Sequence, residues 1–231
     1  MTGMHTVRCG KAEYVPTKIV CVGRNFPNHV KEMGGSVLPA EPVIFIKPNS
    51  SVSFDPAEVI IPSSLGLLHH EVELCALMRK CGRDISQKEA ESSVFGYAVG
   101  IDFTLRERQA AAKKAGEPWT LAKGFDASAV FGKFVPSCDL AEPFTRDITL
   151  SINGEPKQRG NMKEMLFAPA EIISFVSRFM TIEEGDVLMC GTPAGVGEVR
   201  HHDLIDADID GLPPIHFRVI RDLPETLPFS V

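Results

Sequence analysis

The sequence predicts a mixed α+β fold in which strands dominate. Seventeen prolines and nineteen glycines are spread along the 231 residues, which indicates many turns. Short apolar runs of strand length outnumber the segments with helical periodicity, and the regular strand–helix alternation of a doubly wound sheet is missing. The length suits one large domain or two small ones, and no internal repeat or low-complexity linker divides the chain.

The first elements are a strand and a short helix. A strand over residues 18–26 ends at Pro27, which suits a first helical turn because its missing N–H would be unpaired there. About two helical turns follow before Gly34 and Gly35 end them. Further strands are predicted over residues 42–48, 58–62, 70–78 and 97–104.

Two longer helices are marked by their end signals. Ser86 is the expected N-cap of a helix that runs to about Val94, with Glu89 completing a capping box. A second helix begins at about Leu105, is rich in Ala, Arg and Lys, and stops at Gly116.

The C-terminal half is predicted to be mostly β. Asn153-Gly154 is the strongest hairpin signal in the chain, and strands are expected over DVLMCGTP and over residues 215–222. One amphipathic helix interrupts them at about residues 169–180. Its expected apolar side consists of Ile172, Ile173, Phe175, Val176 and Phe179.

Composition narrows the class of protein. The net charge is −6 with acidic and basic residues interspersed, which argues against a nucleic-acid partner. No apolar run approaches the roughly 18 residues that a membrane-spanning helix needs, so no membrane partner is expected. The N-terminus lacks the apolar core of a secretory signal, and a short mitochondrial presequence remains an alternative. We therefore expect a cytoplasmic or mitochondrial protein.

The cysteines indicate reduced thiols. None of the six forms a CxxC pair, and Cys21, Cys75 and Cys190 lie inside apolar strand-like runs.

A carboxylate cluster is the first candidate site. In the segment HHEVELC, Glu71 and Glu73 point to the same side of a strand, because strand side chains alternate. A solvent-facing strand is the simplest explanation of such a pair. However, Asp102 is a lone acid in another apolar strand, and three carboxylates would make a site for Mg²⁺, Mn²⁺ or Ca²⁺. The adjacent His69 and His70 are not needed as ligands.

A second candidate is the pair of His29 and Glu32. Spaced three residues apart, they share a helix face and could act on a water as a general base, although such pairs are also common on surfaces. Arg24 and Asn25 precede them and two glycines follow, which is typical of a short lid over a site.

Several segments, in order and at their spacings, together resemble the fumarylacetoacetate hydrolase superfamily, and within it the small acylpyruvase/oxaloacetate decarboxylase branch. The similarity runs from about Thr17 to Ile220, so residues 1–16 are expected as an N-terminal extension and 17–231 as a single catalytic domain. The segments are KIVCVGRNFPNHVKEM, EPVIFIKP, HHEVEL, YAVGIDFTLRERQ, PWTLAKGFDAS and GDVLMCGTPAGVG. One departure is Phe26, which stands where the family commonly has tyrosine.

The resemblance implies a mixed β-sandwich or roll with a short lid helix, a homodimer, and one Mg²⁺ or Mn²⁺. It implies three sets of site residues in this chain. The metal ligands are Glu71, Glu73 and Asp102; the catalytic residues are His29, Glu32 and Lys123; the substrate contacts are Arg106, Gln109, Thr192 and, more weakly, Lys47.

The implied function is metal-dependent chemistry on small 2-keto acids. Cleavage of the C–C bond of acylpyruvates, decarboxylation of oxaloacetate, or both would use a metal-stabilised enolate. One alternative is an isomerase or decarboxylase of 2-hydroxy-diene dioates in aromatic catabolism. Another is a non-catalytic metal-binding member of the family.

Overall fold

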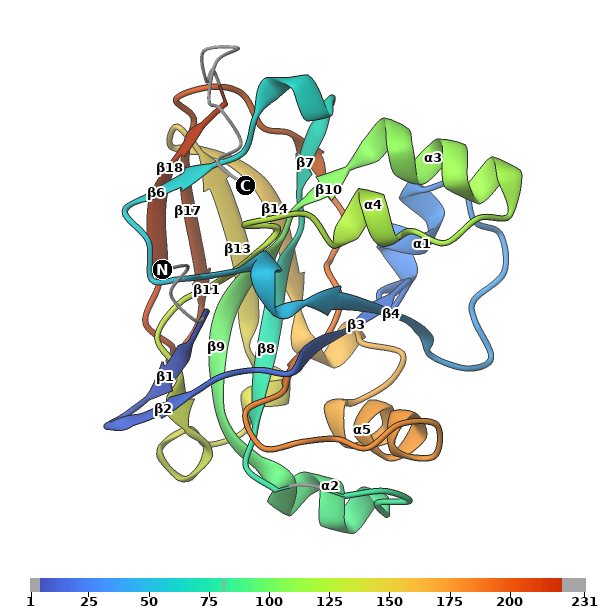
Figure 1. The fold of residues 1–231 in the computed structure, drawn as a ribbon, viewed down its shortest axis with the longest axis vertical. Coiled ribbons are helices and arrows are strands. Elements are labelled where there is room, and N and C mark those ends of the chain that lie inside the picture. The colour runs from blue at the N-terminus through green and yellow to red at the C-terminus, as the bar shows by residue number, and fades with distance from the viewer. Residues whose placement is uncertain (1–4, 81, 222–231) are drawn as a thin grey trace, which may run out of the picture.

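Strands dominate the fold, as predicted (Figure 1). The computed structural model describes residues 5–80 and 82–221. The larger of its two main sheets has eight strands in the order β4-β3-β15-β8-β9-β11-β5, with β12 added beside β9. These strands are β3 (Lys18–Gly23), β4 (Val43–Pro48), β5 (Val52–Phe54), β8 (Val72–Met78), β9 (Val94–Asp102), β11 (Ala129–Phe131), β12 (Val135–Pro136) and β15 (Val187–Met189).

A five-stranded sheet in the order β14-β13-β17-β18-β6 packs against the first, with β13 contacting β8 and β17 contacting β9. The main hydrophobic core fills the space between the sheets, which gives the expected sandwich. The strands are β6 (Glu58–Ile60), β13 (Asp147–Ile152), β14 (Glu155–Asn161), β17 (Leu204–Ile209) and β18 (Ile215–Ile220). Asn153 and Gly154 form the predicted hairpin turn, both with positive φ, as a tight two-residue turn requires.

A small three-stranded sheet interrupts the predicted strand over residues 70–78. Its order is β10-β7-β16, and it contains β7 (Leu68–His70), β10 (Thr104–Leu105) and β16 (Gly197–Glu198). Glu71 lies in the break between β7 and β8, and Phe103 lies in the matching break between β9 and β10. The chain therefore changes sheets at the carboxylate cluster.

The N-terminal segment adds a hairpin of β1 (Val7–Cys9) and β2 (Ala12–Tyr14). Val7 and Cys9 are buried in a second core cluster, together with Phe131 and Phe134.

Five α-helices complete the described part of the fold. They are α1 (Pro27–Glu32), α2 (Gln87–Ser93), α3 (Arg106–Ala115), α4 (Thr120–Lys123) and α5 (Pro169–Ser177). Single turns of 3₁₀ helix occur at Asn49–Ser51, Ser63–Leu65, Ser137–Asp139, Pro143–Thr145 and Met162–Glu164. Figure 1 shows α1, α3 and α4 gathered at one end of the molecule, and α2 and α5 at the other.

The predicted helix ends are largely confirmed. The capping box of Ser86 and Glu89 is present at α2, and Gly116 ends α3 in the left-handed conformation. The helix expected over 169–180 ends earlier, at Ser177. As a result Phe179 lies beyond the helix with 69% of its surface exposed, so its assignment to the apolar side was wrong.

The thiols and the surface agree with a reduced protein of mixed charge. Cys9, Cys21, Cys75 and Cys190 are free and buried, Cys138 is free and exposed, and Cys81 lies outside the described residues.

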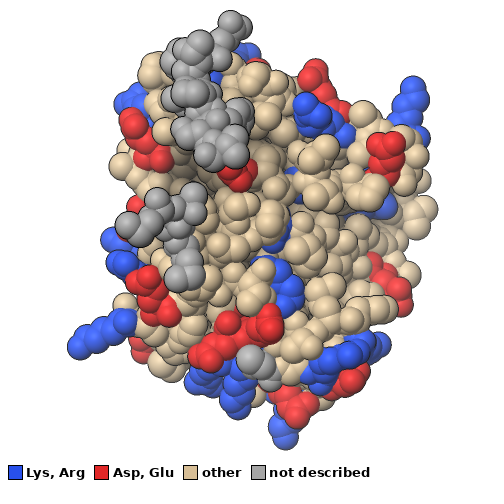
Figure 2. Space-filling model, viewed as in Figure 1, with Lys and Arg blue, Asp and Glu red and all other residues tan. Residues whose placement is uncertain are grey.

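Figure 2 shows basic and acidic side chains intermixed around one face. Within residues 5–80 and 82–221, no helix has both the length and the apolar character to cross a bilayer.

Candidate active site

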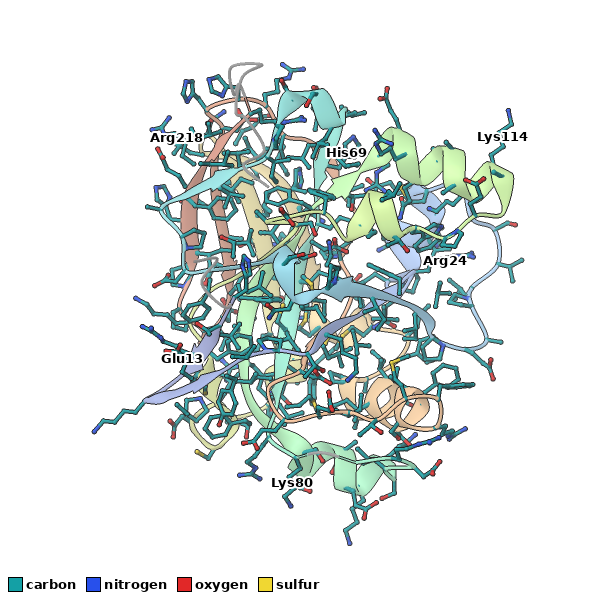
Figure 3. The ribbon with its side chains drawn as sticks, viewed as in Figure 1. Glu13, Arg24, His69, Lys80, Lys114 and Arg218 are labelled. Carbon is teal, nitrogen blue, oxygen red and sulfur yellow. The ribbon has the colours of Figure 1, made fainter. Side chains whose placement is uncertain are left out.

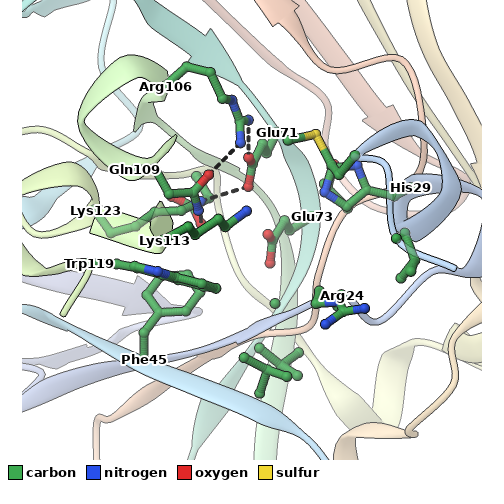
Figure 4. Close-up of a pocket in the computed structure, with 18 of the residues that line it drawn as sticks. Arg24, His29, Phe45, Glu71, Glu73, Arg106, Gln109, Lys113, Trp119 and Lys123 are labelled. Carbon is green, nitrogen blue, oxygen red and sulfur yellow. Dashed lines mark hydrogen bonds and ion pairs between the residues drawn. The ribbon is translucent and has the colours of Figure 1, made fainter. Parts of the chain in front are cut away.

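One pocket of about 320 Å³ gathers most of the expected site residues (Figure 4). Its walls come from β3, α1, β4, α3, α4 and the loop after β15, with the carboxylate cluster along one side. The expected site residues that line it are His29, Glu71, Glu73, Asp102, Arg106, Gln109, Lys123 and Thr192. Glu32 and Lys47 are not among its lining residues, but each contacts one of them.

The three carboxylates converge because of the break between β7 and β8. Val72 and Leu74 point into the core, so the intervening Glu71 and Glu73 point into the pocket. The backbone N–H of Asp102 donates to the carbonyl oxygen of Glu71 at 2.8 Å, which joins the ends of the two strands. One carboxylate oxygen from each of the three side chains lies within 4.8 Å of the others, and all three residues are buried.

Two cationic side chains neutralise part of this cluster. The Lys123 ammonium lies 2.7 Å from Oε2 of Glu71 and 2.6 Å from Oδ2 of Asp102, and Arg106 donates to Oε1 of Glu71 at 2.5 Å. Burial raises the pKa of Glu71, but the charges of Lys123 and Arg106 outweigh burial and hold that pKa well below its usual value. Burial lowers the pKa of Lys123, yet Asp102 and Glu71 more than offset this and raise it.

Lys47 differs from its expected position. It is fully buried behind Asp102, with its ammonium 2.8 Å from Oδ1 of that residue, and it also donates to the main-chain carbonyls of Phe103, Lys123 and Ser128. The ammonium group is thereby used inside the protein, and Lys47 is not among the residues that line the pocket. The structure shows it supporting Asp102 and the end of α4, and the expected substrate contact stays a prediction.

Of the three clustered carboxylates, Glu73 is the one without a cationic partner among the described residues. It accepts a hydrogen bond from the N–H of Gly191 at 2.7 Å, while the recorded ion pairs of the cluster involve Glu71 and Asp102. Burial, together with the charges of Asp102 and Glu71, raises the pKa of Glu73 well above its usual value. A buried carboxylate of this kind needs a cation to remain ionised.

The donor set therefore fits a hard divalent cation. Carboxylate oxygens suit Mg²⁺ or Mn²⁺, and the described cluster has no nitrogen or sulfur ligand of the type that zinc prefers.

His29 and Glu32 form a hydrogen-bonded pair at the opposite wall. Nδ1 of His29 lies 3.1 Å from Oε2 of Glu32, and Oε1 of Glu32 accepts the N–H of Gly195 at 2.9 Å. Glu32 thus orients the imidazole, whose Nε2 is not used in this pair. An imidazole held by a carboxylate beside a pocket can accept and return a proton.

Helix α1 is fixed to the body of the protein by Asn25. The buried Asn25 amide donates to the carbonyls of Phe167 and Cys190 at 3.0 and 2.8 Å, and its oxygen accepts the N–H of Phe167 at 2.8 Å. Gly191 permits this approach, because a Cβ there would lie 2.8 Å from that of Asn25. Phe26 is fully buried, so a tyrosine hydroxyl at this position would need a buried partner.

Gln109 and Thr192 line the pocket as expected, and each is held by a neighbour. Oε1 of Gln109 accepts from Arg106 at 2.6 Å, and Oγ1 of Thr192 accepts from Gln158 at 2.7 Å. Gln158 also pairs with Nδ1 of His70 and with the backbone N–H of Val72. Sequence reasoning missed Gln158 because it lies 34 residues from Thr192 and 88 from His70, with no local motif.

The charged and aromatic side chains among the other pocket residues are Arg24, which the sequence analysis placed only beside the lid, and Phe45, Lys113 and Trp119. A signal for Lys113 was present, because it follows Arg106 and Gln109 by seven and four residues and so shares their helix face.

The sandwich and its carboxylate-lined pocket define a β-rich protein with a candidate site for a divalent cation. The family described as "Fumarylacetoacetate (FAA) hydrolase C-terminal" matches residues 18–220. The chain therefore belongs to the fumarylacetoacetate hydrolase family, as the sequence motifs predicted.

Named relatives span several reactions. The mouse (Mus musculus) protein "Oxaloacetate tautomerase FAHD1, mitochondrial" is 44% identical over 203 residues, which are 88% of this chain and 91% of that protein. The structure of fumarylpyruvate hydrolase from Pseudomonas aeruginosa in complex with Mn²⁺ and pyruvate has a TM-score of 0.89 and 34% identity, covering 96% of this chain and 99% of that one. The structure of 5-carboxymethyl-2-hydroxymuconate delta-isomerase from Mycobacterium smegmatis has a TM-score of 0.80 and 30% identity. The match covers 92% of this chain and 82% of that one. Tautomerisation was not among the reactions expected from the sequence.

Proposed function

We propose that this enzyme acts on small 2-keto acids through an enolate, with keto–enol tautomerisation of oxaloacetate as its main reaction. The observation that carries the proposal is the convergence in one pocket of the carboxylate trio and Lys123 with the oriented imidazole of His29. The mouse relative named for this activity supports the choice of reaction.

Glu71, Glu73 and Asp102 would hold the Mg²⁺ or Mn²⁺. When bound, such a cation supplies Lewis-acid stabilisation of a 2-keto acid that chelates it through its carboxylate and keto oxygens. Among the substrate contacts, Lys123 and Gln109 line the pocket where they can donate hydrogen bonds to the keto oxygen as negative charge develops on it.

His29 would move the proton. In the keto form, Nε2 takes a proton from C3, and the electron pair of the C–H bond forms the C2–C3 double bond while the keto oxygen becomes an enolate. Glu32 stabilises the resulting imidazolium through Nδ1. Return of the same proton to the enolate oxygen gives the enol, so no atom is gained or lost. Thr192, held by Gln158, and Arg106 both line the pocket and would orient the substrate carboxylate.

Hydrolysis of acylpyruvates is the second candidate. The same His29–Glu32 pair could activate a water that attacks the distal carbonyl, and pyruvate enolate would then leave by C–C cleavage. The fumarylpyruvate hydrolase neighbour supports this reaction. Decarboxylation of oxaloacetate needs the same enolate but no activated water. The isomerase neighbour supports 2-hydroxy-diene dioates as a further candidate class of substrate.

The discriminating experiment compares reactions on one preparation. Enol–keto conversion of oxaloacetate, pyruvate release from oxaloacetate, and cleavage of acetylpyruvate and fumarylpyruvate are each measured with Mg²⁺ or Mn²⁺ and with EDTA. The proposal expects metal-dependent tautomerisation to be the fastest of these. Full activity in EDTA, or cleavage that is much faster than tautomerisation, would contradict it.

Two parts of the proposal concern the whole protein. We propose that residues 17–231 form one catalytic domain that acts as a homodimer, and that the enzyme works in the cytoplasm or in mitochondria, the latter being the location in the mouse relative's name. Analytical ultracentrifugation tests the dimer, and a fluorescent fusion to the full chain tests the compartment.

A further inference from the structure

Two cationic side chains of the pocket have no carboxylate partner among the described residues. Arg106 and Lys123 are paired with Glu71, whereas Arg24 and Lys113 form no ion pair with another described residue. The guanidinium of Arg24 donates to the carbonyl of Val37 at 2.7 Å, which leaves its charge uncompensated. A ligand anion can therefore interact with both without displacing an existing ion pair.

Lys113 is directed toward the pocket by its place on α3. It lies one turn beyond Gln109 on the face that lines the pocket, and its ammonium lies 5.1 Å from the ring centroid of Trp119. Figure 4 shows its side chain extending toward the cavity. The next residue, Lys114, is also exposed but extends away from the end of α3 in Figure 3 and does not line the pocket.

Arg24 reaches the pocket from the other side, in the turn between β3 and α1 (Figure 4). Its φ of 60° lies in the left-handed region, which is unfavourable for a residue other than glycine. The Asn25 anchor and the bond to Val37 hold this turn in place. Strain of this kind is found at ligand sites, where the surrounding structure fixes a side chain toward its ligand.

The charge of the pocket favours a dianion. Its described lining carries four cationic side chains against three carboxylates: Arg24, Arg106, Lys113 and Lys123 against Glu71, Glu73 and Asp102. A divalent cation would bring the excess to three positive charges. A monocarboxylate would leave two of these uncompensated and a dicarboxylate only one.

We propose that Arg24 and Lys113 form a subsite for the second carboxylate of a 2-keto dicarboxylate whose keto-acid end faces the carboxylate trio. This rests on the proposed function. Phe45 and Trp119, whose ring centroids are 5.8 Å apart, would contact the carbons between the two ends. The enzyme would then select dicarboxylates over keto acids with a neutral tail.

Binding of unreactive 2-hydroxy acids tests the subsite. Malate and lactate can chelate a metal in the same way, but only malate has a second carboxylate. Calorimetry on the full-length Mn²⁺-loaded protein should show tighter binding of malate. Lys113→Met should lower the affinity for malate relative to lactate by roughly 3- to 10-fold, the range for a partly exposed charge pair. Arg24→Gln should act in the same direction, whereas the matched control Lys114→Met should leave the malate-to-lactate ratio unchanged.

The outcomes separate this inference from the proposed function. The subsite would be overturned if Lys113→Met lowered the affinities for malate and lactate equally. It would also be overturned if Lys114→Met changed the malate-to-lactate affinity ratio as much as Lys113→Met does. If oxaloacetate is turned over but the wild-type protein binds malate no better than lactate, the subsite fails and the function stands. If the malate preference depends on Lys113 but no 2-keto acid is turned over, the subsite stands and the function fails.

Discussion

The backbone N–H of Asp102 donates to the carbonyl of Glu71 at 2.8 Å, at the point where both strands leave the large sheet. This bond sets the separation of two carboxylates that come from segments 31 residues apart in the chain. The pocket is therefore built around a main-chain contact. Because this bond uses no side-chain atom, substitutions of the three acidic side chains leave both of its partners in place.

Glu73→Gln should abolish Mn²⁺ binding while leaving the metal-free protein as stable as the wild type, or more stable. The reason is that Glu73 has a raised pKa and no cationic partner among residues 5–80 and 82–221, so its charge is costly without a metal. Isothermal calorimetry and urea unfolding of the metal-free protein check the two parts. Retention of tight Mn²⁺ binding would remove Glu73 from the ligand set.

Asp102→Asn should also abolish Mn²⁺ binding but destabilise the metal-free protein by roughly 3 to 5 kcal/mol, because the buried ammonium groups of Lys47 and Lys123 lose their shared anion. The contrast with Glu73→Gln in urea unfolding is the measurement. Equal stabilities of the two variants would contradict the assignment of the ion pairs.

Lys47→Met should lower the free energy of unfolding by roughly 3 to 5 kcal/mol, because it removes the buried cation beside Oδ1 of Asp102. It also takes one hydrogen-bond donor from each of the carbonyls of Phe103, Lys123 and Ser128. Lys114→Met is the matched control, and a surface change of this kind should stay within about 0.5 kcal/mol of the wild type. A stable Lys47→Met variant whose only defect is a raised KM would instead support the original assignment to the substrate.

His29→Gln should reduce tautomerisation by roughly 100- to 10,000-fold, the usual contribution of a positioned acid–base group. Mn²⁺ affinity should be unchanged, since His29 is not one of the three clustered carboxylates. Stopped-flow absorbance of the enol gives the rate, and calorimetry gives the affinity. A loss of rate explained entirely by lost metal would refute the proton-transfer role.

Thiol labelling at pH 8 should modify Cys138 and spare Cys9, Cys21, Cys75 and Cys190 in a Cys81→Ser background. Burial raises the pKa of Cys9 to about 11, with the neighbouring Cys138 and Asp139 adding to it, so only a small fraction is thiolate at pH 8. Because thiolate is the reactive form, labelling of Cys9 should increase as the pH rises toward that value. Mass spectrometry counts the labels, and rapid labelling of all four in the native state at pH 8 would contradict their burial.

Features that depend on neighbouring residues could be predicted from the sequence. The Ser86–Glu89 capping box, the end of α3 at Gly116 and the turn at Asn153-Gly154 follow from backbone chemistry within a few positions. The alternation that turns Glu71 and Glu73 to one side also follows from local geometry. The ordered motifs identified the family before any contact was known, because each motif is local even though the site is not.

Contacts between distant segments could not be predicted in this way and become visible in the folded chain. It places Lys47 behind Asp102 and not in the pocket, and it brings Gln158 to His70 and Asn25 to Phe167 across 88 and 142 residues. It also brings Arg24 and Lys113, which lie in different elements, to the walls of the same pocket. The physical reason is that such pairings depend on strand order, on register and on the break between β7 and β8, which no single segment specifies.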